Sequence, residues 1–366
     1  MSLENKAITI TNDLPIKHEG TVHDGKVRSV YWLTQDDSNR LSAGWGLGIQ
    51  GNQKGLMVIS DRISAFDCGW QSESGLKGIP GKGASLNAIS KYWFELFETV
   101  NLGSNHVLAS PHPLVWIVER AEPIMIEAIA RQYITGSMWR DYSEKGVREF
   151  GGLIMPDGLK KDQRLEQVLI TPSTKGIIKG IEGIPEQDDV NITRQHVIDN
   201  YKLFGFKCID DVTVYEKMLK TGFELISANL EKIGKVFVDT KFEFGYVPNE
   251  DEGSFMIYMD EVGTPDSSRY WDKEKYENGK TVEESKEAFR QALLDSVPDR
   301  DVLLNKNRME ERKELARTFR VPDKVFMETS DLYKTLAEHI TGRPIPIIDN
   351  PRQEIIEALI PYGIIR

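Results

Sequence analysis

Charged residues alternate along residues 235–245 in a pattern that could handle a metal–nucleotide complex. In a β-strand, Asp239, Lys241 and Glu243 would lie on one face and the intervening apolar side chains on the other. The simpler interpretation is a half-buried strand whose polar face is solvated. A further acidic pair, at residues 260–261, weakens that interpretation.

The acidic pair ends the next strand-like segment, residues 255–262, and a polar connection with Gly253 joins the two segments. Hairpin pairing can bring this end opposite the first charged face, where like charges repel unless a cation lies between them. Mg²⁺ prefers one or two carboxylates together with phosphate oxygens. We therefore expect Glu243 and Asp260 to bind Mg²⁺, with Lys241 facing the phosphates of a nucleotide.

Several loops combine hydroxyl groups, glycines and cations, as phosphate sites do. Residues 171–176 and 264–269 each begin with Thr-Pro and end near a cation, although each could be an ordinary turn. Residues 19–28 could fold over a triphosphate, but they lack the P-loop motif and precede a strand, so a hairpin turn explains them equally well. Simple structural explanations also exist for the remaining candidates: a surface ion pair at residues 60–67, a linker at 79–83 and a helix start at 131–137.

Covalent catalysis is not indicated, because the six histidines form no metal or catalytic motif and no Ser or Cys nucleophile motif occurs. Phosphoryl transfer by positioning, a metal ion and cations needs no nucleophilic side chain.

Composition limits the partners. The 57 acidic residues exceed the 46 basic ones, and the net charge of −11 would repel nucleic acid or an anionic membrane. Cys68 and Cys208 are too few for a disulfide framework, which favours a reducing compartment. Residues 1–14 lack a signal-like apolar region and no later stretch reaches 18 apolar residues. We expect a cytoplasmic protein without a membrane span.

Residue patterns predict an α+β protein of 366 residues in two or three lobes. The first hundred residues alternate short β-rich runs with glycine-rich connections, which favours a mostly antiparallel lobe. Helices are predicted at 85–100 with Ser85 as N-cap, at 192–204, at 211–234, from a Thr281 capping box to 297, and at 331–340. Strands at 114–118 and 124–129 flank a bend. The predicted divisions are an N-terminal nucleotide-binding lobe (1–122), a second lobe with the metal site (123–275) and a C-terminal helical region (276–366).

Taken together and in order, these segments closely resemble the SAICAR synthetase (phosphoribosylaminoimidazole-succinocarboxamide synthase) family over about residues 20–342. The matching segments are residues 25–31, 60–67, 79–90, 131–137, 171–175, 239–245 and 260–271. The resemblance implies a two-lobed fold with an ATP-grasp-like or kinase-like cleft, an antiparallel N-terminal lobe and a mixed α/β second lobe.

The resemblance also implies site residues. ATP would contact Gly25, Lys26, Arg28, Lys241 and Glu243, with adenine near the backbone of Glu119 and Ala121. Mg²⁺ would bind Glu243 and Asp260. The phosphorylated ribotide would contact Arg131, Ser137, Ser267 and Arg269, with Asp239 and Lys175 near its ring and carboxylate. L-Aspartate would lie near Asp61, Arg62, Ser64 and Asp67. The catalytic residues would be Lys175, Lys241 and Asp239.

The implied reaction joins L-aspartate to the carboxylate of carboxyaminoimidazole ribotide (CAIR) and gives SAICAR, ADP and phosphate. The carboxylate would attack the γ-phosphate, and the aspartate amine would displace phosphate from the acyl phosphate. Mg²⁺, Lys175 and Lys241 would stabilise the developing negative charge. A small-molecule kinase would need the same residues, and a nucleotide-binding regulatory protein would keep them without turnover.

Two positions depart from the family pattern: Gln132 replaces a usual glycine, and Gly263 replaces a bulky apolar residue. We expect these two residues to affect the packing of their local loops. The tail after Arg343 has no counterpart in the pattern and is a candidate contact in a homo-oligomer.

Overall fold

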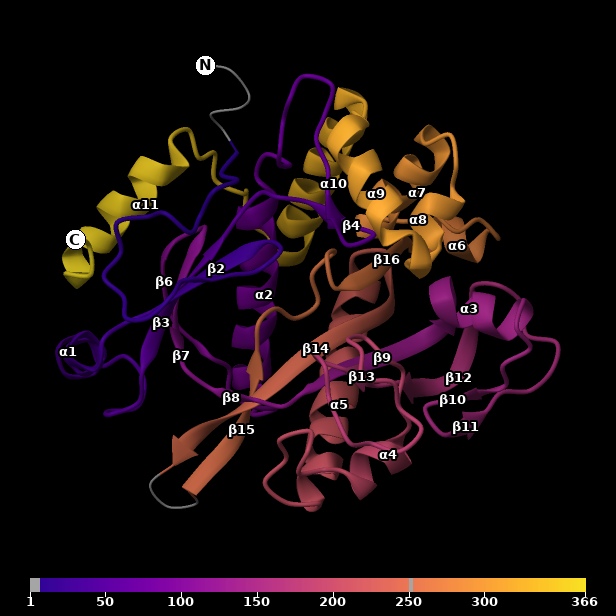
Figure 1. Cartoon of the computed structure of the whole chain (residues 1–366), viewed down its shortest axis with the longest axis horizontal. Coiled ribbons are helices and arrows are strands. Elements are labelled where there is room, and N and C mark those ends of the chain that lie inside the picture. Colours follow the sequence, from indigo (N-terminus) through magenta and orange to yellow (C-terminus); the bar gives the residue numbers. More distant parts are fainter. Residues whose placement is uncertain (1–6, 250–252) are drawn as a thin grey trace. The chain divides into compact units, whose positions relative to one another are not determined.

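A computed structural model of the chain describes residues 7–249 and 253–366 (Figure 1). The chain forms two compact units. Unit 1 comprises Met1–Tyr92, His106–Arg120 and Glu284–Arg366, and unit 2 comprises Trp93–Asn105 and Ala121–Glu283. Unit 2 is therefore inserted between sequence segments of unit 1. The three-part division stays a prediction.

The sheet of unit 1 has five strands in the order β1-β2-β3-β7-β6. Every neighbouring pair is antiparallel, as the glycine-punctuated β-rich segments predicted. The strands are β1 (His23–Asp24), β2 (Arg28–Trp32), β3 (Lys54–Ile59), β6 (Val107–His112) and β7 (Val115–Glu119). Two further short strands, β4 (Ser64–Ala65) and β5 (Cys68–Gly69), pair as a separate hairpin.

Helices of unit 1 cover two apolar cores, one that includes Tyr31, Leu56 and Ile117 and a second that includes Phe289, Leu293 and Leu303. They are α1 (Gln35–Trp45), α7 (Lys286–Ser296), α8 (Asp301–Leu304), η2 (Lys306–Arg308), α9 (Met309–Thr318), α10 (Asp323–Thr341), α11 (Pro351–Leu359) and η3 (Ile360–Tyr362), with α2 (Lys82–Thr99) shared with unit 2. Three predicted helix starts are wrong, the first being that of α10, which begins at Asp323 and not at residue 331. Helix α2 begins before Ser85, whose hydroxyl donates to the Gly81 carbonyl at 2.9 Å. Helix α7 is capped by Ser285, and the Thr281 hydroxyl donates to Asp162 at 2.9 Å.

The C-terminal tail packs within its own unit. Ile355, Leu359 and Ile364 are buried in the same core as the sheet residues. An isolated antiparallel bridge joins Ile16 to Ile365. These contacts account for the buried face of the tail, and a contact between copies of the chain stays a prediction.

The sheet of unit 2 has seven strands, with β12-β9-β14-β15 as its main path. β8, β13 and β16 pair with β14, β9 and β14, respectively. The strands are β8 (Glu122–Pro123), β9 (Ile126–Ile134), β12 (Gln163–Ile170), β13 (Ser173–Thr174), β14 (Lys235–Asn249), β15 (Gly253–Met259) and β16 (Ser268–Asp272). A small hairpin of β10 (Glu149–Phe150) and β11 (Leu153–Ile154) lies apart from this sheet. β16 was not predicted, because its five residues follow directly on the Thr-Pro turn.

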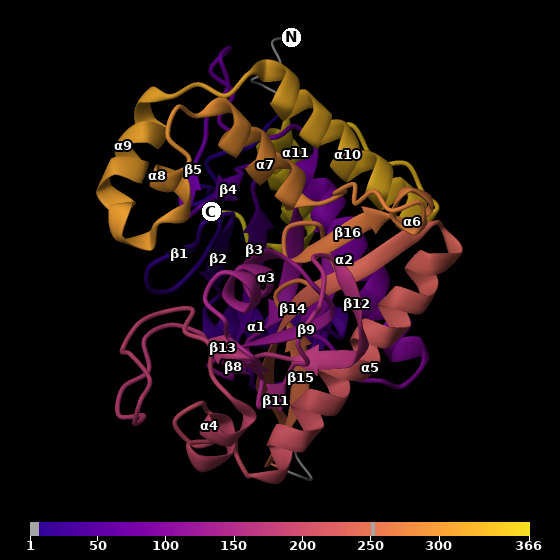
Figure 2. The same ribbon diagram turned by 90° about the vertical axis from the view of Figure 1, so that its right-hand side faces the viewer.

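Within the described residues, four helices belong wholly to unit 2, and Figure 2 shows them from a second side. They are α3 (Gly136–Ser143), α4 (Arg194–Asp199), α5 (Asp210–Lys232) and α6 (Lys273–Glu277). Helix α5 packs its buried side, which includes Phe223 and Ile226, onto the sheet. At the unusual Gly263, φ is +58° and an added Cβ would lie 2.8 Å from the Trp93 ring. The tight packing explains why no bulky residue occupies this position here.

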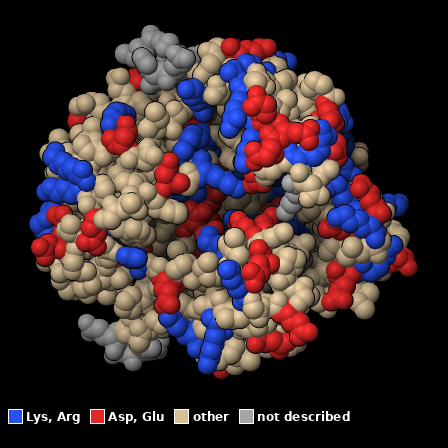
Figure 3. Space-filling model, viewed as in Figure 1, with Lys and Arg blue, Asp and Glu red and all other residues tan. Residues whose placement is uncertain are grey.

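Charges of opposite sign stand beside one another across the face in Figure 3, with a dense mixture over α7–α9. Within the described ranges, no helix has the length and apolar character needed to cross a membrane.

Candidate active site

Two lysines and three carboxylates form a cluster in unit 2, here called the lysine–carboxylate cluster: Lys175, Lys241, Glu127, Glu243 and Asp260. Lys241 Nζ lies 2.9 Å from Glu127 Oε1 and 3.5 Å from Glu243 Oε1. Lys175 Nζ lies 2.6 Å from Glu243 Oε2. Asp260 acts on Lys241 through its charge. With every group ionised, one net negative charge remains.

Strand β14 positions the cluster. Its alternation places Lys241 and Glu243 on one face, whereas Phe242 and Phe244 are buried on the other, as predicted. Register pairs Glu243 with Met259, so Asp260 follows directly after the residue opposite Glu243. The predicted hairpin geometry is therefore confirmed. Asp260 has φ of +54°, a left-handed conformation that ends the strand.

Mutual attraction fixes the ionisation of the cluster. Burial opposes the charge on Lys241, but Glu243 and Glu127 outweigh it and raise the pKa of Lys241 above its ordinary value. Burial likewise opposes the charge on Glu243, but Lys175 and Lys241 hold its pKa below the ordinary range. Lys241 and Glu243 are therefore both charged at neutral pH.

The oxygen donors of this cluster suit a hard cation, because Mg²⁺ takes carboxylate and phosphate oxygens. Among residues 7–249 and 253–366, no three His, Cys, Asp or Glu side chains converge as a ready-made metal site. A magnesium ion would therefore need oxygens from its nucleotide in addition to Glu243 and Asp260.

A second cluster places two guanidinium groups on one carboxylate, and we call it the arginine–aspartate cluster. Arg131 Nη1 donates to Asp239 Oδ2 at 3.1 Å, and Arg269 Nη1 donates to the same oxygen. Arg131 Nε also donates to Thr171 Oγ1 at 2.9 Å. Burial lowers the pKa of Arg131 and Asp239 opposes that effect, but a guanidinium stays protonated. The cluster therefore carries one net positive charge.

Helix α3 begins beside this cluster. Gly136 has φ of +56°, and an added Cβ would lie 2.6 Å from Arg269 Nη2. The N-cap Thr135 makes no capping bond with its side chain, which donates to Asp162 Oδ1 at 2.7 Å. Ser137 lies in the first turn, where backbone N–H groups and the helix dipole favour an anion. The predicted residues Arg131, Ser137 and Arg269 thus belong to one neighbourhood.

Both hydroxyl-rich loops are ordered by local hydrogen bonds. The Thr264 carbonyl accepts from the N–H groups of Ser267 and Ser268 at 3.2 and 2.9 Å. Ser267 is tied to the charged strand, because its carbonyl accepts from Lys241 N at 3.2 Å. In the other loop, Gly176 N donates to Asp188 Oδ1 at 2.7 Å.

Unit 1 holds the remaining predicted side chains. Gly25 N donates to the Arg28 carbonyl at 2.8 Å, which makes residues 25–28 a tight hairpin turn. Lys26 Nζ lies 2.6 Å from Asp67 Oδ1, and both side chains are exposed. Arg62 Nε donates to Ser60 Oγ at 2.9 Å and Nη2 donates to the Gly25 carbonyl at 3.2 Å. The structure therefore joins segments 25–28 and 60–67.

Asp61 differs from its neighbours, because it is only 2% exposed. Its two oxygens accept from Ile8 N and Gly83 N, each at 2.9 Å. Burial raises the pKa of Asp61 to about 6, although these bonds and Lys82 oppose the shift. Both carboxylate oxygens hold backbone together, and a direct substrate contact by Asp61 stays a prediction.

The segment predicted to meet adenine has a buried anchor. The Glu119 carboxylate accepts from Asn52 Nδ2 at 2.7 Å and from Ile49 N at 2.9 Å, and it lies 3.3 Å from Lys54 Nζ. The N–H groups of Glu119 and Arg120 are already bonded within unit 1. Ala121 is in unit 2, beside Gly245. The adenine contact itself stays a prediction.

Glu127 is the member of the lysine–carboxylate cluster that the sequence did not indicate. Ile126 and Ala128 are buried on one face of β9, and the two-residue period of a strand places Glu127 on the other face. The pairing of β9 with β14 places Lys241 opposite Ile129, two residues from Glu127, and so brings the side chains of Glu127 and Lys241 together.

Comparison with known proteins decides the family. The SAICAR synthetase family model matches residues 47–307. The chain belongs to the SAICAR synthetase family. It is 57% identical over the full length of both chains to the phosphoribosylaminoimidazole-succinocarboxamide synthase of Psychromonas ingrahamii, and 58% identical, over 98% of both chains, to that of Shewanella baltica.

Solved structures share the fold. The chain is similar to SAICAR synthase from Saccharomyces cerevisiae complexed with SAICAR, with a TM-score of 0.63 and 25% identity over 92% of this chain and 99% of that one. The α+β, SAICAR synthase-like fold is thus confirmed. As a member of the SAICAR synthetase family, the protein is an amide-forming ligase of purine biosynthesis.

Proposed function

We propose that the protein joins L-aspartate to the carboxylate of CAIR at the expense of ATP, giving SAICAR, ADP and phosphate. The observation that carries this proposal is the pair of neighbouring clusters in unit 2, one with a net negative and the other with a net positive charge. The first suits a magnesium–nucleotide complex, and the second suits the phosphate of a ribotide.

The arginine–aspartate cluster binds the ribotide in this proposal. Arg131 and Arg269 bring two guanidinium groups to one point, and the first turn of α3 adds Ser137. The negative charge of a bound phosphate would share with Asp239 the attraction to the two guanidinium groups. Ser267 lies on the loop that the charged strand holds in place.

The lysine–carboxylate cluster handles the nucleotide and the reacting carboxylate. Glu243 and Asp260 would hold Mg²⁺, which would supply charge stabilisation at the transferred phosphoryl group. Lys241 and Lys175 lie beside them and stabilise negative charge as the CAIR carboxylate attacks the γ-phosphate. The aspartate amine then attacks the acyl phosphate and releases inorganic phosphate.

Residues of unit 1 complete the assignment. Gly25, Lys26 and Arg28 are proposed to contact the nucleotide, and Glu119 and Ala121 mark the adenine segment. Arg62, Ser64 and Asp67 are proposed to bind L-aspartate, with Asp61 holding that segment in shape. In support of the substrate class, the yeast relative forms a complex with SAICAR.

The test measures ADP release and SAICAR formation by the purified protein with Mg-ATP and CAIR, with and without L-aspartate. We expect aspartate-dependent ADP release with one SAICAR formed per ADP. Aspartate-independent ADP release would favour a kinase, and no turnover at all would contradict the ligase proposal.

A further inference from the structure

The hairpin of β4 and β5 has a strained turn. Its two-residue loop consists of Phe66 and Asp67, with φ of +53° and +61°. Both values lie in the left-handed region, which suits Asn or Gly in a type I′ turn and disfavours a bulky side chain such as Phe. The loop sequence does not favour this shape, so other contacts must hold it.

Arg312 of α9 provides such a contact. The Arg312 side chain is 2% exposed, and its three hydrogen bonds all go to backbone carbonyls. Nη1 donates to Phe66 O at 3.2 Å, Nε to Val302 O at 3.0 Å and Nη2 to Asn305 O at 2.9 Å. The planar guanidinium thus joins the turn to the C-terminal end of α8, where carbonyls lack helical partners.

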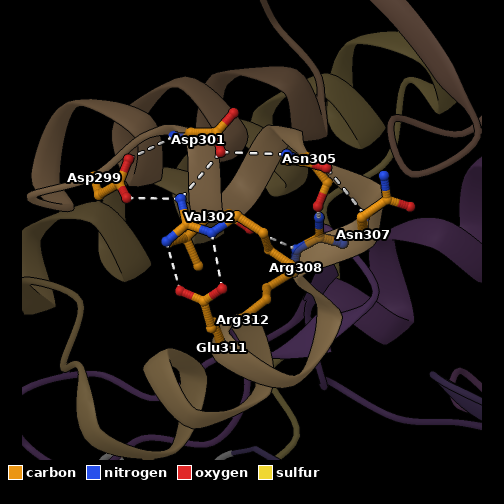
Figure 4. A network of polar contacts seen from close by, with 8 residues as sticks. All are labelled: Asp299, Asp301, Val302, Asn305, Asn307, Arg308, Glu311 and Arg312. Carbon is orange, nitrogen blue, oxygen red and sulfur yellow. Dashed lines mark hydrogen bonds and ion pairs between the residues drawn. The ribbon is translucent and has the colours of Figure 1, made fainter.

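A network of ion pairs holds α8 and α9 in place around Arg312 (Figure 4). Arg308 Nη1 lies 2.8 Å from Asp299 Oδ2 and 3.0 Å from Asp301 Oδ2. Its other nitrogens bind both oxygens of Glu311. Bidentate geometry and several partners make this network more rigid than an isolated surface pair.

The rest of the hairpin is held independently. Trp70 Nε1 donates to the Ala65 carbonyl at 2.9 Å. The Arg290 guanidinium lies 6.0 Å from the centre of the Phe66 ring. Cys68 is buried in the apolar core beneath. Arg312 therefore holds the backbone at the tip of the turn, directly before Asp67, whose side chain pairs with Lys26.

We propose that Arg312 is a positioning residue for L-aspartate, holding Ser64 and Asp67 in the geometry that binds this substrate. The inference rests on the proposed function, which assigns these two residues to L-aspartate. Arg312 lies beyond residue 307, where the match to the family model ends. The C-terminal helical segment thus acts on the substrate site through one buried guanidinium.

The test compares Arg312→Met and Arg312→Lys with the wild-type protein in the SAICAR assay. Arg312→Met should raise the KM for L-aspartate about 10-fold, since small displacements of binding groups have effects of this order or larger. KM values for ATP and CAIR should change less than about 2-fold. The KM for L-aspartate of Arg312→Lys should lie between those of the wild type and Arg312→Met, because one ammonium group cannot donate to three carbonyls as the planar guanidinium does.

Leu359→Ala is the matched control. Leu359 is fully buried, but in the other core of unit 1, which holds the tail. The variant should lower the melting temperature while leaving the KM for L-aspartate unchanged. An unchanged aspartate KM in both Arg312 variants, or an equal rise of all three KM values, would overturn the inference.

Two further outcomes are distinguishable. If neither Arg312 variant folds, Arg308→Gln takes their place, because it loosens α8 and α9 while keeping Arg312. A KM for L-aspartate in Arg308→Gln equal to that of the wild type would then overturn the inference. Failure of the proposed function itself appears earlier, as a wild-type protein that forms no SAICAR from L-aspartate.

Discussion

The charged face of β14 in unit 2 and the β4–β5 hairpin in unit 1 hold candidate site residues in different ways. On β14, Lys241 and Glu243 lie on a regular strand within a sheet, and they fix one another by charge. In the hairpin, the backbone of Phe66 and Asp67 is strained, and a side chain 246 positions away along the chain holds it.

The two groups of site residues should therefore be sensitive to different kinds of substitution. A change on β14 should alter charge while the strand keeps its shape, because the sheet pairs that strand with neighbours on both sides. A change around the hairpin should alter shape without touching a charge in the site. The following predictions test that contrast, in order of decreasing effect.

Glu243→Gln should produce the largest effect. Loss of its charge removes a proposed magnesium ligand and the partner of Lys175, and turnover should fall about 1,000-fold or more. The circular dichroism spectrum should be unchanged, because β14 keeps its sheet partners. Glu231→Gln is the control, since Glu231 pairs with Lys273 at 2.7 Å on an exposed surface. Near-native turnover in Glu243→Gln would remove it from the metal site.

Arg269→Ala should weaken binding of the phosphorylated substrate by about 100-fold, as expected for loss of one partner in a buried charged contact. Isothermal titration with SAICAR measures this affinity directly. Arg164→Ala, an exposed position on β12, serves as control. Equal affinities in the two variants would place the phosphate elsewhere.

Asp61→Asn tests the buried carboxylate of unit 1 by pH. The folded pKa of about 6 lies above the ordinary value near 4, so protonated Asp61 adds stability below about pH 4 that is lost as pH rises through 6. The free energy of unfolding of the wild type, minus that of Asp61→Asn, should therefore be larger at pH 4 than at pH 7 by about 2 kcal/mol. Urea unfolding at both pH values measures it, and a pH-independent difference would contradict the shift.

Gly136→Ala should weaken SAICAR binding about 10-fold, because the new methyl group would displace the Arg269 guanidinium 2.6 Å away. Gly180→Ala is matched to it: φ is +82° at that position and nothing lies within 4 Å. Both variants should lose about 1 kcal/mol of stability from backbone strain. Equal SAICAR affinities would show that Gly136 does not set the position of Arg269.

Lys26→Met should have the smallest effect on stability. Its ion pair with Asp67 is exposed, so the free energy of unfolding should change by less than about 0.5 kcal/mol. Lys54→Met provides the contrast, because Lys54 is fully buried beside Glu119 and its loss should cost about 3 kcal/mol. Chemical unfolding of both variants makes the comparison.

Sequence patterns predicted the regular part of the site well. Alternation on β14 and the following hairpin placed Lys241, Glu243 and Asp260 together, because side-chain period and register follow from strand geometry. The antiparallel sheet of unit 1 was predicted from short β-rich runs joined by glycine-rich connections.

Other features depend on contacts between distant segments. No local pattern indicates that Arg312 bonds to Phe66, or that Asp61 holds Ile8 and Gly83 together. Helix α1 was missed because seven polar residues crowd its eleven positions and only two of its residues are buried. Glu127 was missed because the importance of its strand face emerges only when β9 pairs with β14.

Insertion of unit 2 within unit 1 has a consequence for synthesis on the ribosome. Residues of unit 2 are all available once Glu283 has emerged, whereas unit 1 still lacks Glu284–Arg366. Its core needs Ile364, and Pro15 receives its backbone hydrogen bond from Arg366 at 2.8 Å. The first strands of the chain must therefore wait, with part of their apolar surface uncovered, until Glu284–Arg366 has emerged. Nascent chains should bind chaperones through this N-terminal sheet throughout that interval.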